Sequence, residues 1–180
     1  MSQVSSAILQ RTASAGRRGT EARIILYRIR EVDGRDEEIA EILAELHRLT
    51  FFHGAPIPSF DWGHWWLAYR GATPVAFSGA VPSTYDRNAG YICRVGVLAG
   101  HWGRRLQLRL MRAMESRARR NGWKYVVSDT TGNIASANNF IRAGYRLYRP
   151  RYPWAFVGTL YWRKNIRPRP SLHRTHSKRP

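Results

Sequence analysis

The sequence predicts an α/β (α+β) domain in which one mixed, twisted sheet of six to seven strands carries helices on both faces. Two strand-like runs, 65–69 and 74–81, are joined by a short connection that contains glycine, as in a β-hairpin. Two further runs, 91–98 and 123–129, flank an amphipathic stretch that is rich in arginine. A second amphipathic stretch lies before the hairpin. This alternation of strands and helices is the basis of the predicted fold class.

The length and composition fit one globular domain with loose ends. The chain has 180 residues, of which 43% are hydrophobic. No apolar run approaches the roughly 18 residues needed to cross a bilayer, so no membrane anchor is expected. The first residues are rich in Ser, Ala and Arg, and the last are basic and free of acid. We therefore expect a flexible N-terminal arm over 1–22, a domain over 23–162 and a disordered basic tail over 163–180.

The charge and the cysteine count limit the partners and the compartment. The formal net charge is +18, from 30 basic and 12 acidic residues. Contact with a nucleic acid and a solvated basic surface are both open readings of this excess. Cys93 is the single cysteine, which excludes an internal disulfide and favours a reducing, cytoplasmic compartment. We interpret Cys93 as a small buried side chain and expect a monomer or a homodimer, in which an exposed closing strand pairs between subunits.

The first part of the chain reads as strand, helix and loop. A β-branched, apolar run predicts a strand over 24–29. Asp33 or Asp36 can cap a following helix, whose apolar residues recur at helical spacing up to Leu49. The segment 51–63 holds prolines and aromatic rings, and it is either a packed loop or part of a substrate pocket.

The last part of the chain predicts a short helix and two closing strands. Asn133 can cap a helix that ends at Gly144, and strands are expected over 146–149 and 156–162. The two prolines Pro150 and Pro153 separate these strands.

The helix after Gly103 offers a site for a phosphate group. Its apolar residues fall on one face and its arginines on the others. The N–H groups of a first helical turn have no partner within the helix and attract anions. Arg104 and Arg105 would add positive charge. A pyrophosphate is therefore one candidate ligand, and a turn that binds nothing is the other reading.

A second motif makes the phosphate reading specific. Asn133, Ser136, Phe140, Gly144 and Tyr145 form the pattern N-x-x-S-x-x-x-F-x-x-x-G-Y. Together with the preceding strand, turn and basic helix, it resembles the GNAT superfamily of acetyl-CoA-dependent N-acetyltransferases. The resemblance implies a GNAT-like acetyltransferase domain over 23–162, with acetyl-CoA as co-substrate and a sheet that splays beside the cofactor.

The resemblance also implies which residues hold acetyl-CoA. The strand before the turn would bind the pantetheine arm, the turn would wrap the pyrophosphate, and the capped helix would lie beside the thiol. Compared with the usual pattern, Trp102 replaces a basic residue, and Arg105 and Gln107 replace small ones. The predicted cofactor-binding residues are Val95, Gly96, Val97, Trp102, Gly103, Arg104, Arg105, Leu106, Gln107, Asn133, Ser136 and Asn139.

The residues for proton transfer are less clearly marked. Members of this family often have a tyrosine, as proton donor to the leaving thiolate, where this chain has Phe140. Tyr145 is the candidate for that role, with Tyr148 beside it. Asp129, at a strand end, is the preferred base, and His64, His53 or a chain of waters are the alternatives. No spacing of His, Cys and Asp suggests a metal.

The sequence thus predicts an N-acetyltransferase that moves an acetyl group from acetyl-CoA to a primary amine by direct attack in a ternary complex. The acceptor is open. The alternative is a nucleic-acid-associated protein on the same fold, either a base-modifying transferase or a non-catalytic binder that uses the basic helix and tails.

Overall fold

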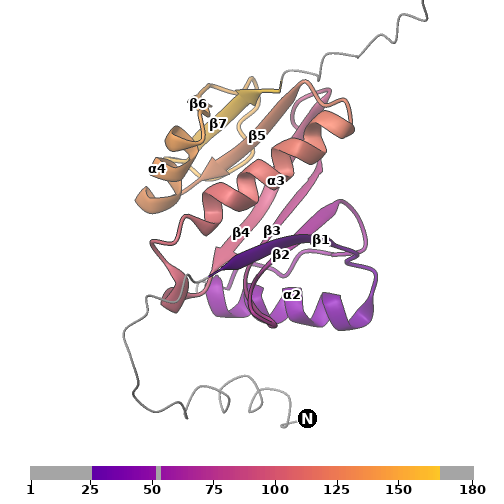
Figure 1. Ribbon diagram of the computed structural model, residues 1–180. Helices are drawn as coiled ribbons and strands as arrows, with labels where there is room; N and C mark the ends of the chain where they lie inside the picture. The colour runs from indigo at the N-terminus through magenta and orange to yellow at the C-terminus, as the bar shows by residue number, and fades with distance from the viewer. Residues whose placement is uncertain (1–25, 52–53, 167–180) are drawn as a thin grey trace, which may run out of the picture.

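The computed structural model describes residues 26–51 and 54–166. This part of the chain forms a seven-stranded sheet in the order β1-β2-β3-β4-β5-β7-β6 with three α-helices (Figure 1). The predicted class, a mixed sheet with helices, is confirmed. The predicted arm over 1–22 and most of the predicted tail lie outside the described residues. The elements are β1 Tyr27–Val32, α2 Glu37–Thr50, β2 His64–Arg70, β3 Thr73–Pro82, β4 Ala89–Val97, a 3-10 turn Ala99–His101, α3 Leu106–Arg120, β5 Tyr125–Thr130, α4 Ile134–Arg142, β6 Arg146–Leu147 and β7 Leu160–Asn165.

The sheet consists of two antiparallel parts that meet at one parallel pair. Strands β1 to β4 form an antiparallel meander. Strand β7 is antiparallel to both of its neighbours, β5 and β6. Strand β4 runs parallel to β5. Helix α3 connects the two strands and returns the chain to the end of the sheet where β4 began. This junction is where the two parts of the sheet can separate.

Two apolar clusters cover the two faces of the sheet. Helix α3 packs on one face, where Leu110, Met111 and Met114 are fully buried with Trp162. Helix α2 packs on the other face through Leu43 and Leu46, against residues of β2 and β3. Figure 1 shows α2 and α3 on opposite sides of the meander. No helix among the described residues is long and apolar enough to cross a membrane.

The last strand begins and ends later than predicted. The sequence places it over 156–162 and a disordered tail from Arg163, but β7 covers Leu160–Asn165 and pairs with β5 along its whole length. The Nζ of Lys164 lies 2.7 Å from Oε2 of the buried Glu115. Residues 163–165 therefore belong to the domain. Strand β7 lies between β5 and β6, although the two-residue β6 pairs with it only at Trp162 and Arg163.

The close approach of α2 to β4 depends on Gly96. A Cβ at Gly96 would lie 2.3 Å from Oγ1 of Thr50 and 2.4 Å from Cε1 of Phe77. We expect Gly96→Ala to lower the free energy of unfolding by about 1–3 kcal/mol, because both neighbours are held by packing. Gly100→Ala is the matched control, since a Cβ there meets nothing within 4 Å. Urea unfolding of both variants measures the difference, and equal midpoints would contradict this account.

Candidate active site

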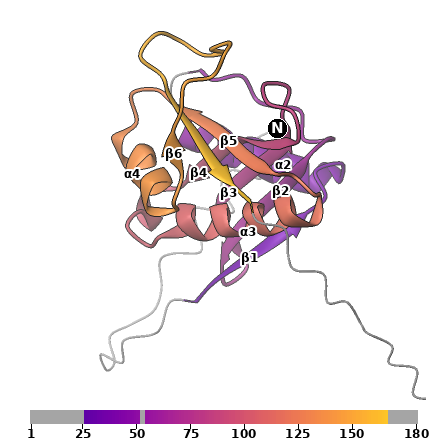
Figure 2. The same cartoon turned by 90° about the horizontal axis from the view of Figure 1, so that it is seen from above.

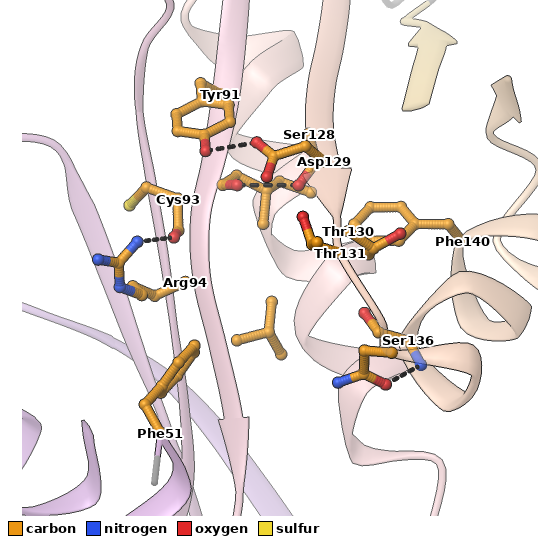
Figure 3. A pocket seen from close by; sticks show the side chains of 13 residues that line it. Phe51, Tyr91, Cys93, Arg94, Ser128, Asp129, Thr130, Thr131, Ser136 and Phe140 are labelled. Atoms are coloured by element: carbon orange, nitrogen blue, oxygen red, sulfur yellow. Dashed lines mark hydrogen bonds between the residues drawn. The ribbon is translucent and has the colours of Figure 1, made fainter. Parts of the chain in front are cut away.

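The sheet opens between β4 and β5. The two strands pair only through residues 89–91 and 125–127. Where they separate, the hydroxyl of Ser128 donates to the carbonyl of Ile92 at 2.9 Å. Beyond this point lies an open pocket of about 230 Å³ between the strands and the start of α4 (Figure 3). It is lined by Phe51, Tyr91, Ile92, Cys93, Arg94, Val95, Ser128, Asp129, Thr130, Thr131, Asn133, Ser136 and Phe140.

The backbone of β4 faces this gap at alternate residues. The N–H of Leu98 donates to β3 at 3.0 Å, so the alternation of an antiparallel pair turns the N–H and C=O groups of Val97 and Val95 away from β3. The indole of Trp102 donates to the carbonyl of Val97 at 2.8 Å. Gly96 turns its backbone groups toward β3 and is explained by its packing. Of the three residues predicted to contact the pantetheine arm, Val95 is the one that the geometry supports best. The carbonyl of Val97 is bonded to Trp102, and Gly96 serves the packing of α2 against β4.

Helix α3 begins beside the gap without a side-chain cap. Asp36 and Asn133 accept hydrogen bonds from the first turns of α2 and α4, but no side chain does so for α3. The chain enters α3 through two residues with positive φ, Gly103 at 72° and Arg105 at 57°. Arg105 therefore adopts a left-handed conformation that suits glycine, and its side chain is exposed. The first N–H groups of α3 are left available to an anion.

The side chain of Gln107 connects α3 to α4. Its Nε2 donates to Oγ of Ser136 at 3.0 Å, and its Oε1 accepts from Nδ2 of Asn139 at 2.8 Å. Asn133 holds the same turn, since its Oδ1 accepts from the N–H of Ser136 at 2.9 Å. Four of the predicted cofactor-binding residues therefore lie together, and two of them, Asn133 and Ser136, line the pocket.

Asp129 lies in the pocket and is fixed by two donors. The hydroxyl of Tyr91 and the indole of Trp154 donate to the same oxygen, Oδ1, at 2.7 and 2.9 Å. Burial, with the charge of Asp129, raises the pKa of Tyr91, so its hydroxyl stays a donor. Tyr85 stacks on Trp154 with ring centroids 4.2 Å apart. Neither the hydrogen bond from Tyr91 nor the one from Trp154 involves Oδ2 of Asp129.

Tyr145 does not line the pocket. It is buried against Phe140, with ring centroids 5.1 Å apart, and Nζ of Lys164 lies 5.5 Å from the centre of its ring. Burial, with the nearby carboxylate of Glu115, raises the pKa of Tyr145. The geometry therefore gives Tyr145 a role in packing and does not support the predicted proton donation in the pocket.

The other predicted candidates for proton transfer are Tyr148, His64 and His53. Tyr148 is half-buried beside β7, and burial raises its pKa to about 12. His64 lies elsewhere, where its Nδ1 is 3.3 Å from Oε1 of Glu31. His53 lies outside the described residues. No group of three His, Cys, Asp or Glu residues in the described ranges could hold a metal ion.

The α2 side of the pocket is formed by Arg94, Cys93 and Phe51. The guanidinium of Arg94 donates to the carbonyl of Cys93 at 2.7 Å and to Nε2 of His47 at 3.2 Å. Burial raises the pKa of Cys93 to about 11, so its thiol is protonated at neutral pH and is a poor nucleophile. Cys93 is only partly buried and lines the pocket, so the prediction of a buried side chain is wrong in this respect.

His47 gives the domain a predicted dependence on pH. Burial, together with the charges of Arg94 and Arg48, lowers the pKa of His47 below 6.5. As the pH falls below about 6.5, the unfolded chain binds a proton that the folded protein resists, so stability is lost on acidification. His47→Gln, which keeps an acceptor for Arg94, should reduce the fall in melting temperature between pH 7.5 and 5. An unchanged fall would show that His47 titrates normally.

Several residues that line the pocket or bond to its side chains carry no signal in the sequence. Trp154 comes from the loop between β6 and β7, which Figure 2 shows projecting beyond the strands. Its only local marker is the neighbouring Pro153. Tyr91 and Arg94 lie on a strand whose apolar run hides which side chains face the gap. Alternation along β4 places Tyr91 and Val95 on the same face of the strand. It does not reveal that Tyr91 bonds to Asp129 on the neighbouring strand.

The sheet is split between β4 and β5, and the uncapped start of α3 at the opening can hold an anionic group. The chain belongs to the acetyltransferase (GNAT) family, because the model of that family matches residues 36–145. The family uses an acyl-CoA donor and an acceptor, so the protein is an acyltransferase. A search of curated proteins found no significant match.

Solved structures support the same fold. An acyl-CoA N-acyltransferase from Klebsiella pneumoniae, so named only provisionally, is 19% identical with a TM-score of 0.63 and covers 79% of this chain and 99% of its own. The IAA acetyltransferase from Bacillus cereus is 12% identical with a TM-score of 0.62, covering 78% and 100%. An acetyltransferase of the GNAT family from Staphylococcus aureus is 16% identical with a TM-score of 0.61, covering 79% and 100%.

Proposed function

We propose that this protein transfers an acetyl group from acetyl-CoA to a primary amine by direct attack in a ternary complex. The observation that carries the proposal is the gap between β4 and β5, which has an uncapped helix at one end and the carboxylate of Asp129 at the other. A donor and an acceptor can approach the same pocket from these two ends.

The residues on the donor side fit a CoA ester. The first N–H groups of α3 suit a pyrophosphate, and the exposed Arg104 adds charge next to them. The backbone groups of Val95 suit the amides of a pantetheine arm, as a strand does in a sheet. Trp102 is exposed and its indole occupies the carbonyl of Val97 that faces the gap, but Trp102 does not line the pocket itself.

The residues on the acceptor side fit a proton transfer from an amine. Attack on a thioester needs a neutral nitrogen, and Asp129 can accept the proton that this nitrogen loses. Tyr91 and Trp154 hold Oδ1, which leaves Oδ2 to the acceptor. The raised pKa of Cys93 argues against an acyl-cysteine intermediate. These features support direct transfer.

A thermal-shift titration tests the donor. Acetyl-CoA binds the native state, so it should raise the melting temperature in a concentration-dependent way. Arg104→Ala should weaken this shift, because Arg104 stands at the presumed pyrophosphate site. Arg112→Ala is the matched control, since Arg112 is also exposed but lies two turns further along α3. The absence of any shift at millimolar acetyl-CoA would count against the proposal.

Mass spectrometry tests the acceptor. Incubation with acetyl-CoA and a mixed panel of amines, peptides and nucleic acids should yield products heavier by one acetyl group on an amine. Acetylation of a base in the nucleic acid pool would instead support the base-modifying alternative.

Charge segregation favours a second candidate function, contact with a nucleic acid. Helix α2 carries Glu37, Glu38, Glu41 and Glu45, whereas the outer face of α3 carries arginines. From Arg70 to Ile166 the acidic residues are Asp86, Glu115 and Asp129. Asp86 lies 3.8 Å from Arg163, Glu115 is paired with Lys164, and Glu31 of β1 pairs with Arg117 and Arg120 of α3. The remaining arginines of α3, Arg109, Arg112 and Arg119, have no acidic partner among the described residues. A basic face of this kind attracts phosphates.

Retention on DNA and RNA over a salt series tests this candidate. Phosphate contacts weaken steeply with salt, so retention should fall as salt rises. The full chain should be compared with a chain that lacks residues 167–180, because β7 requires residues 160–165. Loss of all retention in the shortened chain would show that the folded domain is not the binding element.

A further inference from the structure

Two departures from the usual family pattern meet at one side chain. Gln107 stands where a small residue is usual, and Phe140 stands where a tyrosine often supplies a hydroxyl. Gln107 donates to Ser136 at 3.0 Å, and Ser136 lies one turn before Phe140 on the face of α4 that lines the pocket. Gln107 is thus bonded to a hydroxyl that lies one helical turn from Phe140.

The hydrogen bonds at Ser136 have a direction. Asn139 donates to Oε1 of Gln107 at 2.8 Å, which leaves Nε2 of Gln107 to donate to Oγ of Ser136. Because Oγ already accepts this bond, the hydroxyl proton of Ser136 is free to be given to another acceptor. Figure 3 shows the Ser136 side chain at the edge of the pocket, opposite β4.

The surroundings of this hydroxyl are otherwise apolar or engaged. Phe140 is buried and stacks on Trp162 with ring centroids 5.6 Å apart. Oγ1 of Thr130 accepts from the indole of Trp162 at 2.9 Å, and Ser128 donates to Ile92. The hydroxyls of Ser136 and Thr130 both accept a bond and keep a proton to donate, and of the two only Ser136 is bonded to α3 through Gln107.

We propose that the hydroxyl of Ser136 stabilises the departing thiolate of CoA, with Gln107 and Asn139 as positioning residues that aim its proton into the pocket. This inference rests on the proposed acetyl transfer. Ser136 is then the catalytic residue that takes over the task of the hydroxyl missing at Phe140.

The step balances without a further reactant. The amine nitrogen forms a bond to the carbonyl carbon of the acetyl group, and the bond from that carbon to sulfur breaks. The amine loses a proton to Asp129, which passes it to solvent. The sulfur leaves with the electron pair as a thiolate that accepts a hydrogen bond from Ser136, and it is protonated by solvent after release. Ser136 keeps its own proton throughout.

Binding of CoA and desulfo-CoA tests the contact without any acceptor. The two probes carry the same pyrophosphate, but only CoA has the sulfur. In the unaltered protein, CoA should bind more tightly than desulfo-CoA, and the ratio should grow between pH 7 and 9 as the thiol ionises. A hydrogen bond to a charged group predicts a preference of about 10-fold or more at pH 9.

Three variants isolate the hydroxyl and its orientation. Ser136→Ala should abolish the preference for CoA, whereas Ser136→Thr, which keeps a hydroxyl, should retain it. Gln107→Glu has the same shape but only accepts hydrogen bonds, so it should turn the Ser136 proton away from the pocket and also abolish the preference. The added negative charge weakens the phosphate contacts of both probes alike, but it also repels the thiolate of CoA, so a loss in Gln107→Glu supports the inference only together with the Ser136 variants.

The outcomes separate this inference from the proposed function. If neither probe binds the unaltered protein, the proposed acetyl transfer fails. If both bind equally at pH 9, the role of Ser136 is overturned and acetyl transfer stands. A preference that survives Ser136→Ala also overturns it. With an acceptor found, Ser136→Ala should lower kcat by about 10- to 100-fold with little change in the KM for acetyl-CoA.

Discussion

Asp129→Asn is expected to lower kcat/KM for acetyl transfer by about 100- to 10,000-fold, the range in which a general base contributes. Asparagine has nearly the same shape and keeps an oxygen that accepts from Tyr91 and Trp154. It cannot take a proton from the amine. The thermal shift by acetyl-CoA should therefore remain, while product formation in a coupled thiol assay should nearly stop.

The pH profile of this variant provides a sharper test. An amine with an ordinary pKa near 10 loses its own proton as the pH rises, so the defect of Asp129→Asn should shrink toward pH 10. Asp86→Asn is the matched control, because Asp86 pairs with Arg163 and does not line the pocket. Full activity of Asp129→Asn at pH 7 would remove Asp129 from the reaction.

Lys164→Met is expected to destabilise the fold by about 3 kcal/mol. Lys164 donates to Glu115 at 2.7 Å and to the carbonyl of Ala143 at 2.6 Å. The side chain of Glu115 is only 5% exposed, so methionine at 164 would leave a buried carboxylate without its cation. Denaturant unfolding followed by tryptophan fluorescence measures the change.

A second substitution distinguishes this cause from a general loss of packing. Glu115→Leu in the Lys164→Met background removes the unpaired charge and should restore most of the lost stability. Lys124→Met is the control, since Lys124 is exposed at the start of β5. If Lys164→Met behaves like Lys124→Met, the ion pair contributes little.

Features encoded within a few residues were predictable from the sequence. The cap of α4 is one example, because Asn133 and the N–H of Ser136 lie in the same turn. The start of α2 is another, and of the two candidates Asp36 is the one that caps it. The mixed sheet, predicted with six to seven strands, and the resemblance to the family followed from such local patterns, because strand and helix periods survive in a single sequence.

Features that need distant partners were not predictable. Trp154 reaches Asp129 from the loop before β7, and nothing in the spacing of these residues marks them as neighbours. The predicted end of the domain, at residue 162, is too early because Arg163 and Lys164 resemble a solvated tail. In the structure Arg163 lies over two tyrosine rings and Lys164 pairs with the buried Glu115. Charged residues in a strand are recognised as part of the fold only when their partners are known.

The uneven placement of charge has a kinetic consequence for the donor. Acid on α2 and arginine on α3 give the molecule an electric dipole across the sheet. A polyanion such as CoA would be steered in solution toward the α3 side, where the helix opens, before any contact forms. The association rate should then fall steeply as ionic strength rises, while the dissociation rate changes little.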